Sequence, residues 1–199
     1  MLYGAILGDS HIELNGNSAR VRFDHSIKQR DYIEWKYKIL TPYCTTLRLY
    51  KVFDKRTQQY YEKIRFNSKT LPIFNTFRMK WGTLVPRNHF YVGQKKRIPS
   101  NISDYLNSAL ALAIWYCDDG GKKKDCKAYR LHTNCFSFYE VELLQGALKK
   151  NFARNSSIHK QGKGFLIYIR AKDSMAERFC DIVKPIVSSK IPSMLYKFY

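Results

Sequence analysis

Acidic residues are scarce in this chain: 16 Asp and Glu stand against 35 Lys and Arg, a formal net charge of +19 over 199 residues. The apolar share is 45% and the aromatic share 15%, which excludes a disordered basic tail and indicates a chain folded around a core. A folded protein with this charge is expected to bind a polyanion or an anionic membrane surface. Nucleic acid is the first hypothesis, and a soluble protein that is merely basic is the alternative.

Long hydrophobic runs are also missing. Runs such as Leu110–Cys117 are far too short to span a bilayer. The chain begins inside an apolar pattern, without a charged segment followed by an apolar one as in a signal peptide. We therefore expect no membrane partner.

Paired cysteines are absent as well. None of the five cysteines forms a CxxC pair, and no His lies at zinc-finger spacing from two of them, so a structural zinc site is not expected. We expect a reduced intracellular compartment in which disulfides do not hold the fold together. The five are Cys44, Cys117, Cys126, Cys135 and Cys180.

A repeated helix-capping signal divides the chain into two similar halves. Ser26-Ile-Lys-Gln29 and Ser137-Phe-Tyr-Glu140 each have the form of a capping box and begin 111 residues apart (26 to 137). A third box, Ser174-Met-Ala-Glu177, predicts a helix that ends at Pro185, with a counterpart helix from about Leu71 to Trp81. We expect repeats over residues 1–97 and 98–199, joined by a linker at Gly93–Ser103.

Alternating polar and apolar residues predict strands between these helices. The alternation is visible at Arg20–Asp24, Lys63–Phe66 and Arg130–His132, and the turn at Gly162–Gly164 predicts a hairpin over Ser157–Arg170. Each half then has the order αββαββα, an α+β unit whose antiparallel sheet is covered by helices on one face. The other face, rich in Arg, Lys, Tyr and His, must face water or a partner.

Two short apolar segments carry the candidate chemistry. Leu2–Ser10 and Leu112–Gly120 each predict a helix that ends near an acid, Asp9 or Asp119, and these acids are 110 residues apart (9 to 119). Gly4 and Gly8 lie one turn apart and allow close helix contact. Two such helices side by side would gather two carboxylates and two negative helix ends, which calls for a cation. Oxygen ligands alone favour Mg²⁺ or a similar hard ion, Mn²⁺ included. The alternative for either segment alone is a plain helix cap or turn.

The two segments resemble the paired motifs of the LAGLIDADG homing endonucleases in their single-chain, two-repeat form. The second, Leu112-Ala-Ile-Trp-Tyr-Cys-Asp-Asp-Gly-Gly121, is similar to the subgroup that includes I-SceI. The likeness covers nearly the whole chain, because it continues in three further segments. These are Lys95-Lys-Arg-Ile-Pro99, Phe136-Ser-Phe-Tyr-Glu-Val-Glu-Leu143 and Met194-Leu-Tyr-Lys197.

The resemblance implies two sheets that form a saddle over DNA and a metal-dependent cut of both strands that leaves 3′ overhangs. It implies that Asp9 and Asp119, with the carbonyls of Gly8 and Asp118, hold divalent metal ions. It also implies one basic residue for each active site, Lys96 and Lys197. Lys190 is a rival for Lys197 because Lys190-Ile-Pro192 is similar to Arg97-Ile-Pro99, and Lys96 has the alternative of a simple phosphate contact.

The remaining polar residues are predicted to contact DNA in two ways. Arginines and their neighbours on the open sheet faces are suited to reading base edges: Arg20, Arg22, Lys63, Arg65, Arg130, His132 and Arg170. Loop charges are suited to phosphate contacts: Lys122, Lys123, Lys124, Lys160, Lys163, Lys55 and Arg56. The alternative for each is a solvated surface charge. One further position in each half is predicted to orient the attacking water or to contact DNA. In the first half this is Asp24 or His25, and in the second half it is His132 or Asn134.

Three functions compete. The first is a site-specific endonuclease that acts as a monomer on double-stranded DNA. The second is an intron maturase, an RNA-binding splicing cofactor, since intron-encoded relatives in the family include such proteins. The presence of both motif acids argues against a maturase without any catalytic activity. The third is a structural nucleic-acid binder for which metal changes nothing. A mitochondrion or chloroplast suits an intron-encoded protein, and the sequence does not distinguish these from a microbial source.

Overall fold

The computed structural model describes residues 1–81, 86–87, 90–91, 96–153 and 155–199. The chain forms two compact units: one is Asp9–Gln94, and the other joins Met1–Gly8 to Lys95–Tyr199. The N-terminal helix therefore belongs to the unit built from the second half of the chain. The predicted repeat boundary at residues 97 and 98 stays a prediction.

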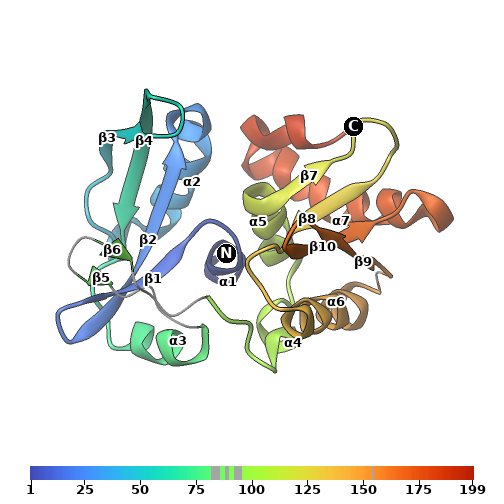
Figure 1. Cartoon of the computed structure of the whole chain (residues 1–199), viewed down its shortest axis with the longest axis horizontal. Helices are drawn as coiled ribbons and strands as arrows, with labels where there is room; N and C mark the ends of the chain where they lie inside the picture. The colour runs from blue at the N-terminus through green and yellow to red at the C-terminus, as the bar shows by residue number, and fades with distance from the viewer. Residues whose placement is uncertain (82–85, 88–89, 92–95, 154) are drawn as a thin grey trace. The chain divides into compact units, whose positions relative to one another are not determined.

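The unit Asp9–Gln94 contains an antiparallel sheet of four strands in the order β1-β2-β4-β3, with helices packed on it (Figure 1). The strands predicted at Arg20–Asp24 and Lys63–Phe66 are confirmed as parts of β2 and β4, and the helix predicted over residues 71–81 is confirmed as α3. The elements are β1 (His11–Asn15), β2 (Ser18–Ser26), η1 (Ile27–Gln29), α2 (Arg30–Leu40), η2 (Thr41–Tyr43), β3 (Arg48–Asp54), β4 (Gln59–Asn67), α3 (Ile73–Trp81) and the two-stranded β5 (Pro86–Arg87) and β6 (Phe90–Tyr91).

Alternation along β2 decides which face of this sheet is covered. Ala19, Val21 and Phe23 are fully buried, whereas Arg20 and Arg22 between them are partly exposed. Successive side chains of a strand point to opposite faces, so the apolar set meets helices α2 and α3 and the arginines lie on the open face.

The second unit repeats the pattern with helix α1 added. Its sheet has the order β7-β8-β10-β9, and helices α5, α6 and α7 pack on it (Figure 1). The predicted hairpin over residues 157–170 is confirmed as β9 and β10. The elements are α1 (Leu2–Leu7), α4 (Ile102–Tyr105), α5 (Ala109–Asp119), β7 (Gly120–Lys122), β8 (Tyr129–His132), α6 (Phe138–Phe152), β9 (Ser157–Gln161), β10 (Gly164–Ile169), η3 (Lys172–Ser174), α7 (Met175–Lys190) and η4 (Pro192–Lys197).

The three predicted capping boxes have different outcomes. The box at Ser137 is confirmed: its hydroxyl accepts from the Glu140 backbone N–H, and the Glu140 side chain accepts from the Ser137 backbone N–H. Ser26 caps only a short 3₁₀ turn, because the Gln29 side chain turns to His25 instead. The box at Ser174 is wrong: Ser174 has a left-handed backbone (φ 55°) and its side chain makes no cap hydrogen bond.

The predicted helix end at Pro185 is also wrong. Helix α7 continues through Pro185 to Lys190. A proline inside a helix removes one backbone hydrogen bond and costs roughly 3 kcal/mol. The continuous apolar face of α7, with Phe179, Val183 and Val187 fully buried, provides more stabilisation than that local loss.

The linker predicted at Gly93–Ser103 is partly helical. Gly93 to Lys95 lie outside the described residues, and α4 begins at Ile102, which is buried. Among the described residues, no helix is long and apolar enough to cross a membrane.

Candidate active site

Helix α5 carries the second motif and forms the centre of its unit. The Ser108 hydroxyl accepts from the Ala111 backbone N–H at 3.2 Å and starts the helix, and every residue from Ala111 to Cys117 is buried. The helix ends at Asp119 because Gly120 turns the chain into β7. A Cβ atom on Gly120 would lie 2.1 Å from the Tyr116 ring, so only glycine allows this exit.

Helix α1 carries the first motif and packs directly against α5. A Cβ on Gly4 would lie 2.2 Å from the carbonyl oxygen of Ala111, and one on Gly8 would lie 2.3 Å from the Cβ of Asp118. The close contact predicted from these two glycines is therefore confirmed. Gly8 and Asp118 meet at the C-terminal ends of the two helices, where each is followed by the predicted acid.

A lysine side chain binds the C-terminal end of each motif helix. Lys96 Nζ donates to the carbonyls of Leu7, at 3.4 Å, and Gly8, at 2.5 Å. Lys197 Nζ donates to the carbonyls of Asp118, at 3.2 Å, and Gly120, at 2.8 Å. The last carbonyls of a helix lack partners within it and carry partial negative charge, so a cation is favoured at both ends.

The predicted metal ligands of this site are all oxygen atoms, and the metal site stays a prediction. The carbonyls of Gly8 and Asp118 each accept a hydrogen bond from a lysine ammonium group. Each carbonyl oxygen has two lone pairs and can serve a second partner. With the carboxylates of Asp9 and Asp119 next in the chain, the donors are all oxygen atoms, the ligands that Mg²⁺ prefers.

The segment that carries Lys96 is anchored by the capping box of α6. Glu140 Oε1 accepts from the backbone N–H of Ile98 at 3.0 Å, while Oε2 accepts from Ser137. Burial raises the pKa of Glu140, but hydrogen bonds from Ser137 and Ile98 outweigh burial and bring the pKa below its usual value. The ionised carboxylate therefore ties this segment to α6.

A cavity of about 450 Å³ adjoins this segment. Its lining carries three positive charges, from Lys96, Arg97 and Lys163, and one negative charge, from Glu140, and it includes the amide of Asn134. The structure thus brings together three predicted site residues, Lys96, Asn134 and Lys163. Arg97 was missed as an individual candidate, although it lies in the basic run that drew attention to Lys96.

The open sheet face of the unit Asp9–Gln94 holds its arginines in fixed positions. Glu13 is only 3% exposed, and its carboxylate accepts from Arg20 Nε at 2.7 Å and Arg22 Nη2 at 2.9 Å. Charge-assisted pairs of this kind restrict the rotamers of both arginines. Glu13 was missed in the sequence, and the pairing of β1 with β2 that places it opposite Arg20 is a tertiary property.

Tyr50 orders the other predicted residues of this face. Its hydroxyl donates to Asp24, its ring lies 4.5 Å from the Arg65 guanidinium, and Lys63 Nζ lies 3.5 Å from Asp24. Burial, followed by the Asp24 carboxylate, raises the pKa of Tyr50 well above its ordinary value, so the phenol keeps its proton. His25, by contrast, points to the covered side: it is buried and lies close to Asp9.

The residues of the second unit that are predicted to contact DNA differ in their exposure and in their side-chain partners. Arg130 is partly exposed and His132 is exposed, while Asn134 donates to Gln161 at 3.3 Å. Arg170 comes directly after the last residue of β10, Ile169, and pairs with Asp173 at 3.0 Å. Lys123 pairs with Asp125 at 2.8 Å.

Two of the predicted phosphate-binding lysines belong to the helix-covered side of their sheet. Lys122 lies in β7 opposite Tyr129, and its Nζ donates to the carbonyl of Phe198 at 2.6 Å. Lys160 lies opposite Phe165, whose ring contacts Phe138 of α6. The prediction that these two lysines contact DNA depended on their being loop charges, and both lie in strands.

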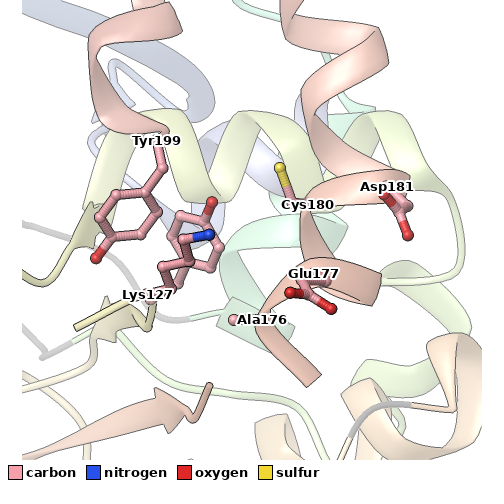
Figure 2. Close-up of a pocket in the computed structure, with 7 residues that line it drawn as sticks. Lys127, Ala176, Glu177, Cys180, Asp181 and Tyr199 are labelled. Atoms are coloured by element: carbon pink, nitrogen blue, oxygen red, sulfur yellow. The ribbon is translucent and has the colours of Figure 1, made fainter. Parts of the chain in front are cut away.

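A second cavity, of about 300 Å³, lies beside helix α7. Cys180, Glu177 and Asp181 of α7 line it together with Lys127 and Tyr199 (Figure 2). Among the described residues that line it there is no predicted site residue, so it is not part of the candidate active site.

Comparison with known proteins decides the family. Residues 1–176 match the model of the LAGLIDADG DNA endonuclease family. The chain belongs to this family. The resemblance seen in the two motifs is thereby confirmed over most of the chain.

The curated relatives of this family member include two kinds of protein. The chain is 33% identical to the cytochrome b mRNA maturase bI2 of Saccharomyces cerevisiae, over 99% of this chain and 46% of that protein. It is 30% identical to the probable intron-encoded endonuclease 1 of Wickerhamomyces canadensis, over 98% of this chain and 81% of that protein. The chain thus spans less than half of the first relative and most of the second.

A solved structure confirms the fold class. The homing endonuclease I-WcaI, bound to its DNA recognition sequence, matches with a TM-score of 0.81 and 29% identity, over 100% of this chain and 84% of that chain. The LAGLIDADG family member described here thus has the expected α+β fold with two four-stranded antiparallel sheets.

Proposed function

We propose that this chain is a site-specific homing endonuclease that hydrolyses both strands of a long DNA target and leaves 3′ overhangs. The observation that carries the proposal is the pair of lysines, Lys96 and Lys197, each bound to the end of one motif helix beside a motif acid, Asp9 or Asp119. A protein that only binds nucleic acid has no need for this arrangement twice. Membership of the family and the likeness to I-WcaI support it.

Asp9 and Asp119, with the carbonyls of Gly8 and Asp118, are the residues that would hold divalent cations, Mg²⁺ or Mn²⁺. When bound, such a cation supplies Lewis-acid chemistry for phosphodiester hydrolysis. The side chains then need to do little proton transfer themselves. Lys96 and Lys197 hold positive charge at the same carbonyls, where they offset negative charge that develops on the phosphate.

The partner is double-stranded DNA, held by the two sheet faces. Arg20 and Arg22, oriented by Glu13, are suited to base edges, while Lys163 and Arg97 are suited to phosphates. Because both motifs lie in one chain, we propose a monomer. An intron-encoded protein of this kind would work in an organelle such as the mitochondrion.

The proposal is tested by selecting cleaved sites from a randomised DNA pool, with and without Mg²⁺, and then substituting the acids. We expect double-strand cleavage only with the metal, and a loss of at least about 100-fold in Asp9→Asn and in Asp119→Asn, with nicking of one strand remaining in either variant. Asp181→Asn, in the separate cavity of α7, is the matched control and should cut at the parent rate. Normal cutting by both acid variants would show that the metal site is wrong.

A second candidate function is intron splicing as a maturase. The specific observation in its favour is the 33% identity to a cytochrome b mRNA maturase over 99% of this chain. A splicing assay on the host intron with Asp9→Asn and Asp119→Asn separates the two. Normal splicing without DNA cleavage would establish an RNA function that does not depend on the acids.

A further inference from the structure

A buried histidine and a buried lysine lie behind the first motif acid. Lys36 of α2 is 0% exposed and His25 of β2 is 3% exposed, and Lys36 Nζ lies 3.1 Å from His25 Nε2. The Lys36 ammonium also lies 4.1 Å from the centre of the Tyr32 ring. Burying an ammonium group is expensive unless it is paired, so this contact is a specific feature of the fold.

The contact sets which nitrogen of His25 carries the proton. An ammonium group has three donors and no acceptor, so His25 Nε2 must accept the hydrogen bond from Lys36. The ring proton is then on Nδ1. Nδ1 then donates to Gln29 Oε1 at 3.0 Å, and the same edge of the ring lies 3.7 Å from Asp9 Oδ2, close enough for an electrostatic contact but too far for a hydrogen bond.

The second half of the chain has no such pair at the equivalent positions. His25 immediately precedes the capping residue Ser26, and Lys36 follows that residue by ten positions (26 to 36). The same positions around Ser137 are Phe136 and Ala147, both apolar and buried, at 4% and 2% exposure. The sheet register aligns His25 with Thr133 instead, because His11 and Gly121, each two positions after a motif acid, pair with Arg22 and Arg130. By either count the second half has no histidine and lysine in contact at this place, so the fold itself does not require the buried pair.

We propose that His25, oriented by Lys36, is a positioning residue for the carboxylate of Asp9. His25 contacts Asp9 from the buried side, and groups of the layer around a metal-binding side chain fix its orientation and typically change metal affinity or activity by roughly 10–100-fold when removed. This inference rests on the proposed function and deepens it. Asp9 and Asp119 would then not be equivalent: the site served by Asp9 depends on a buried relay, and the site served by Asp119 does not.

The decisive variant is His25→Phe/Lys36→Met, which gives the first half an apolar pair like that of the second. We expect it to fold with a melting temperature at least equal to that of the parent, because a buried polar pair is replaced by apolar side chains. On target DNA labelled on each strand, we expect one strand to be cut about tenfold or more slowly, with the other within about twofold. A purely structural defect would slow both strands together.

A readout that does not depend on cleavage is Mn²⁺ titration followed by broadening of backbone amide resonances. Binding near Asp9 should weaken by about tenfold or more in the double variant, while binding near Asp119 should stay within about twofold. The ring nitrogens of His25 in the metal-free parent should show a protonated Nδ1, and Lys36→Met should remove that preference. If the parent itself cuts no DNA, the proposed function fails, and this titration still decides the role of His25.

Thr133→Val is the matched control in the other half. Thr133 is fully buried and its hydroxyl donates to the carbonyl of Phe165 at 2.8 Å, so the variant also loses a buried polar contact. It should change neither the ratio of the two strand cuts nor Mn²⁺ binding near Asp9. Equal slowing of both strands by the double variant, or an unchanged Mn²⁺ affinity near Asp9, would overturn the proposal.

Discussion

Lys96 and Lys197 are the single residues whose placement says most about the site. They are 101 positions apart (96 to 197), yet each binds backbone carbonyls at the end of one motif helix. The structure also separates the rivals: Lys190 is the last residue of α7, while Lys197 reaches Asp118 and Gly120. The choice of Lys197 over Lys190 therefore has a geometric reason.

At the residue scale, we predict that Lys96→Met and Lys197→Met each slow cleavage of target DNA by about 100-fold. Methionine keeps the length of the side chain but removes the positive charge at the helix end, and a single lost electrostatic contact at a reacting phosphate costs about this much. The measurement is single-turnover cleavage with saturating Mg²⁺. Lys190→Met is the matched control, and a slowing by Lys190→Met equal to that of Lys197→Met would reverse the assignment.

At the scale of elements, the contact between α1 and α5 explains the two glycines of the first motif. The nearest atoms to an added Cβ on Gly4 are backbone atoms of Ala111, which cannot rotate away as a side chain can. The two helices approach at the distance that glycine allows. This contact assigns α1 to the unit of the second half, although it is the first element of the chain.

The corresponding prediction compares two glycine-to-alanine variants. Gly4→Ala should lower the free energy of unfolding by about 1–3 kcal/mol, because overpacking forces the helices apart. Gly146→Ala in α6 should raise it by about 0.5–1 kcal/mol, because nothing lies within 4 Å of its added Cβ and alanine favours a helix. Urea unfolding measures both, and a destabilisation by Gly146→Ala as large as that of Gly4→Ala would contradict the close contact.

Local signals predicted some elements well and others poorly. The Ser137 box is entirely local, since its two hydrogen bonds join residues three apart, and it formed as predicted. The Ser174 box has the same sequence form but failed, because Ala176 donates its backbone N–H to Arg170 and the turn there is left-handed. The stop predicted at Pro185 failed because burial of one helix face outweighs the local effect of proline.

At the scale of the whole molecule, the net charge of +19 becomes a distribution over particular surfaces. Glu13 lies between Arg20 and Arg22 on one open sheet face. Arg97 and Lys163 line the cavity beside Lys96, whereas Lys122 and Lys160 lie on the helix-covered side of their sheet. The contribution of a lysine or arginine to DNA binding is therefore expected to depend on which surface of the protein carries it.

A comparison of two double variants tests this expectation at equal change in net charge. Arg97→Ala/Lys163→Ala should reduce the slope of log affinity for DNA against log salt concentration by about 1.8, because each phosphate contact contributes about 0.9. Lys122→Ala/Lys160→Ala should reduce it by less than about 0.5. Fluorescence anisotropy over a range of salt concentrations measures both slopes, and equal reductions would show that net charge alone matters.

By itself, the sequence predicted the α+β class from periodicity and singled out the two acids through a repeated motif. The family, and with it the two lysines as candidate site residues, came from the resemblance of those motifs to the LAGLIDADG homing endonucleases. Only the tertiary structure decided that Glu13 pairs with Arg20 and Arg22 and that Lys36 contacts His25. Those contacts depend on strand register and on which helix face is buried, and a shift of one residue in register turns every side chain of a strand to the other face.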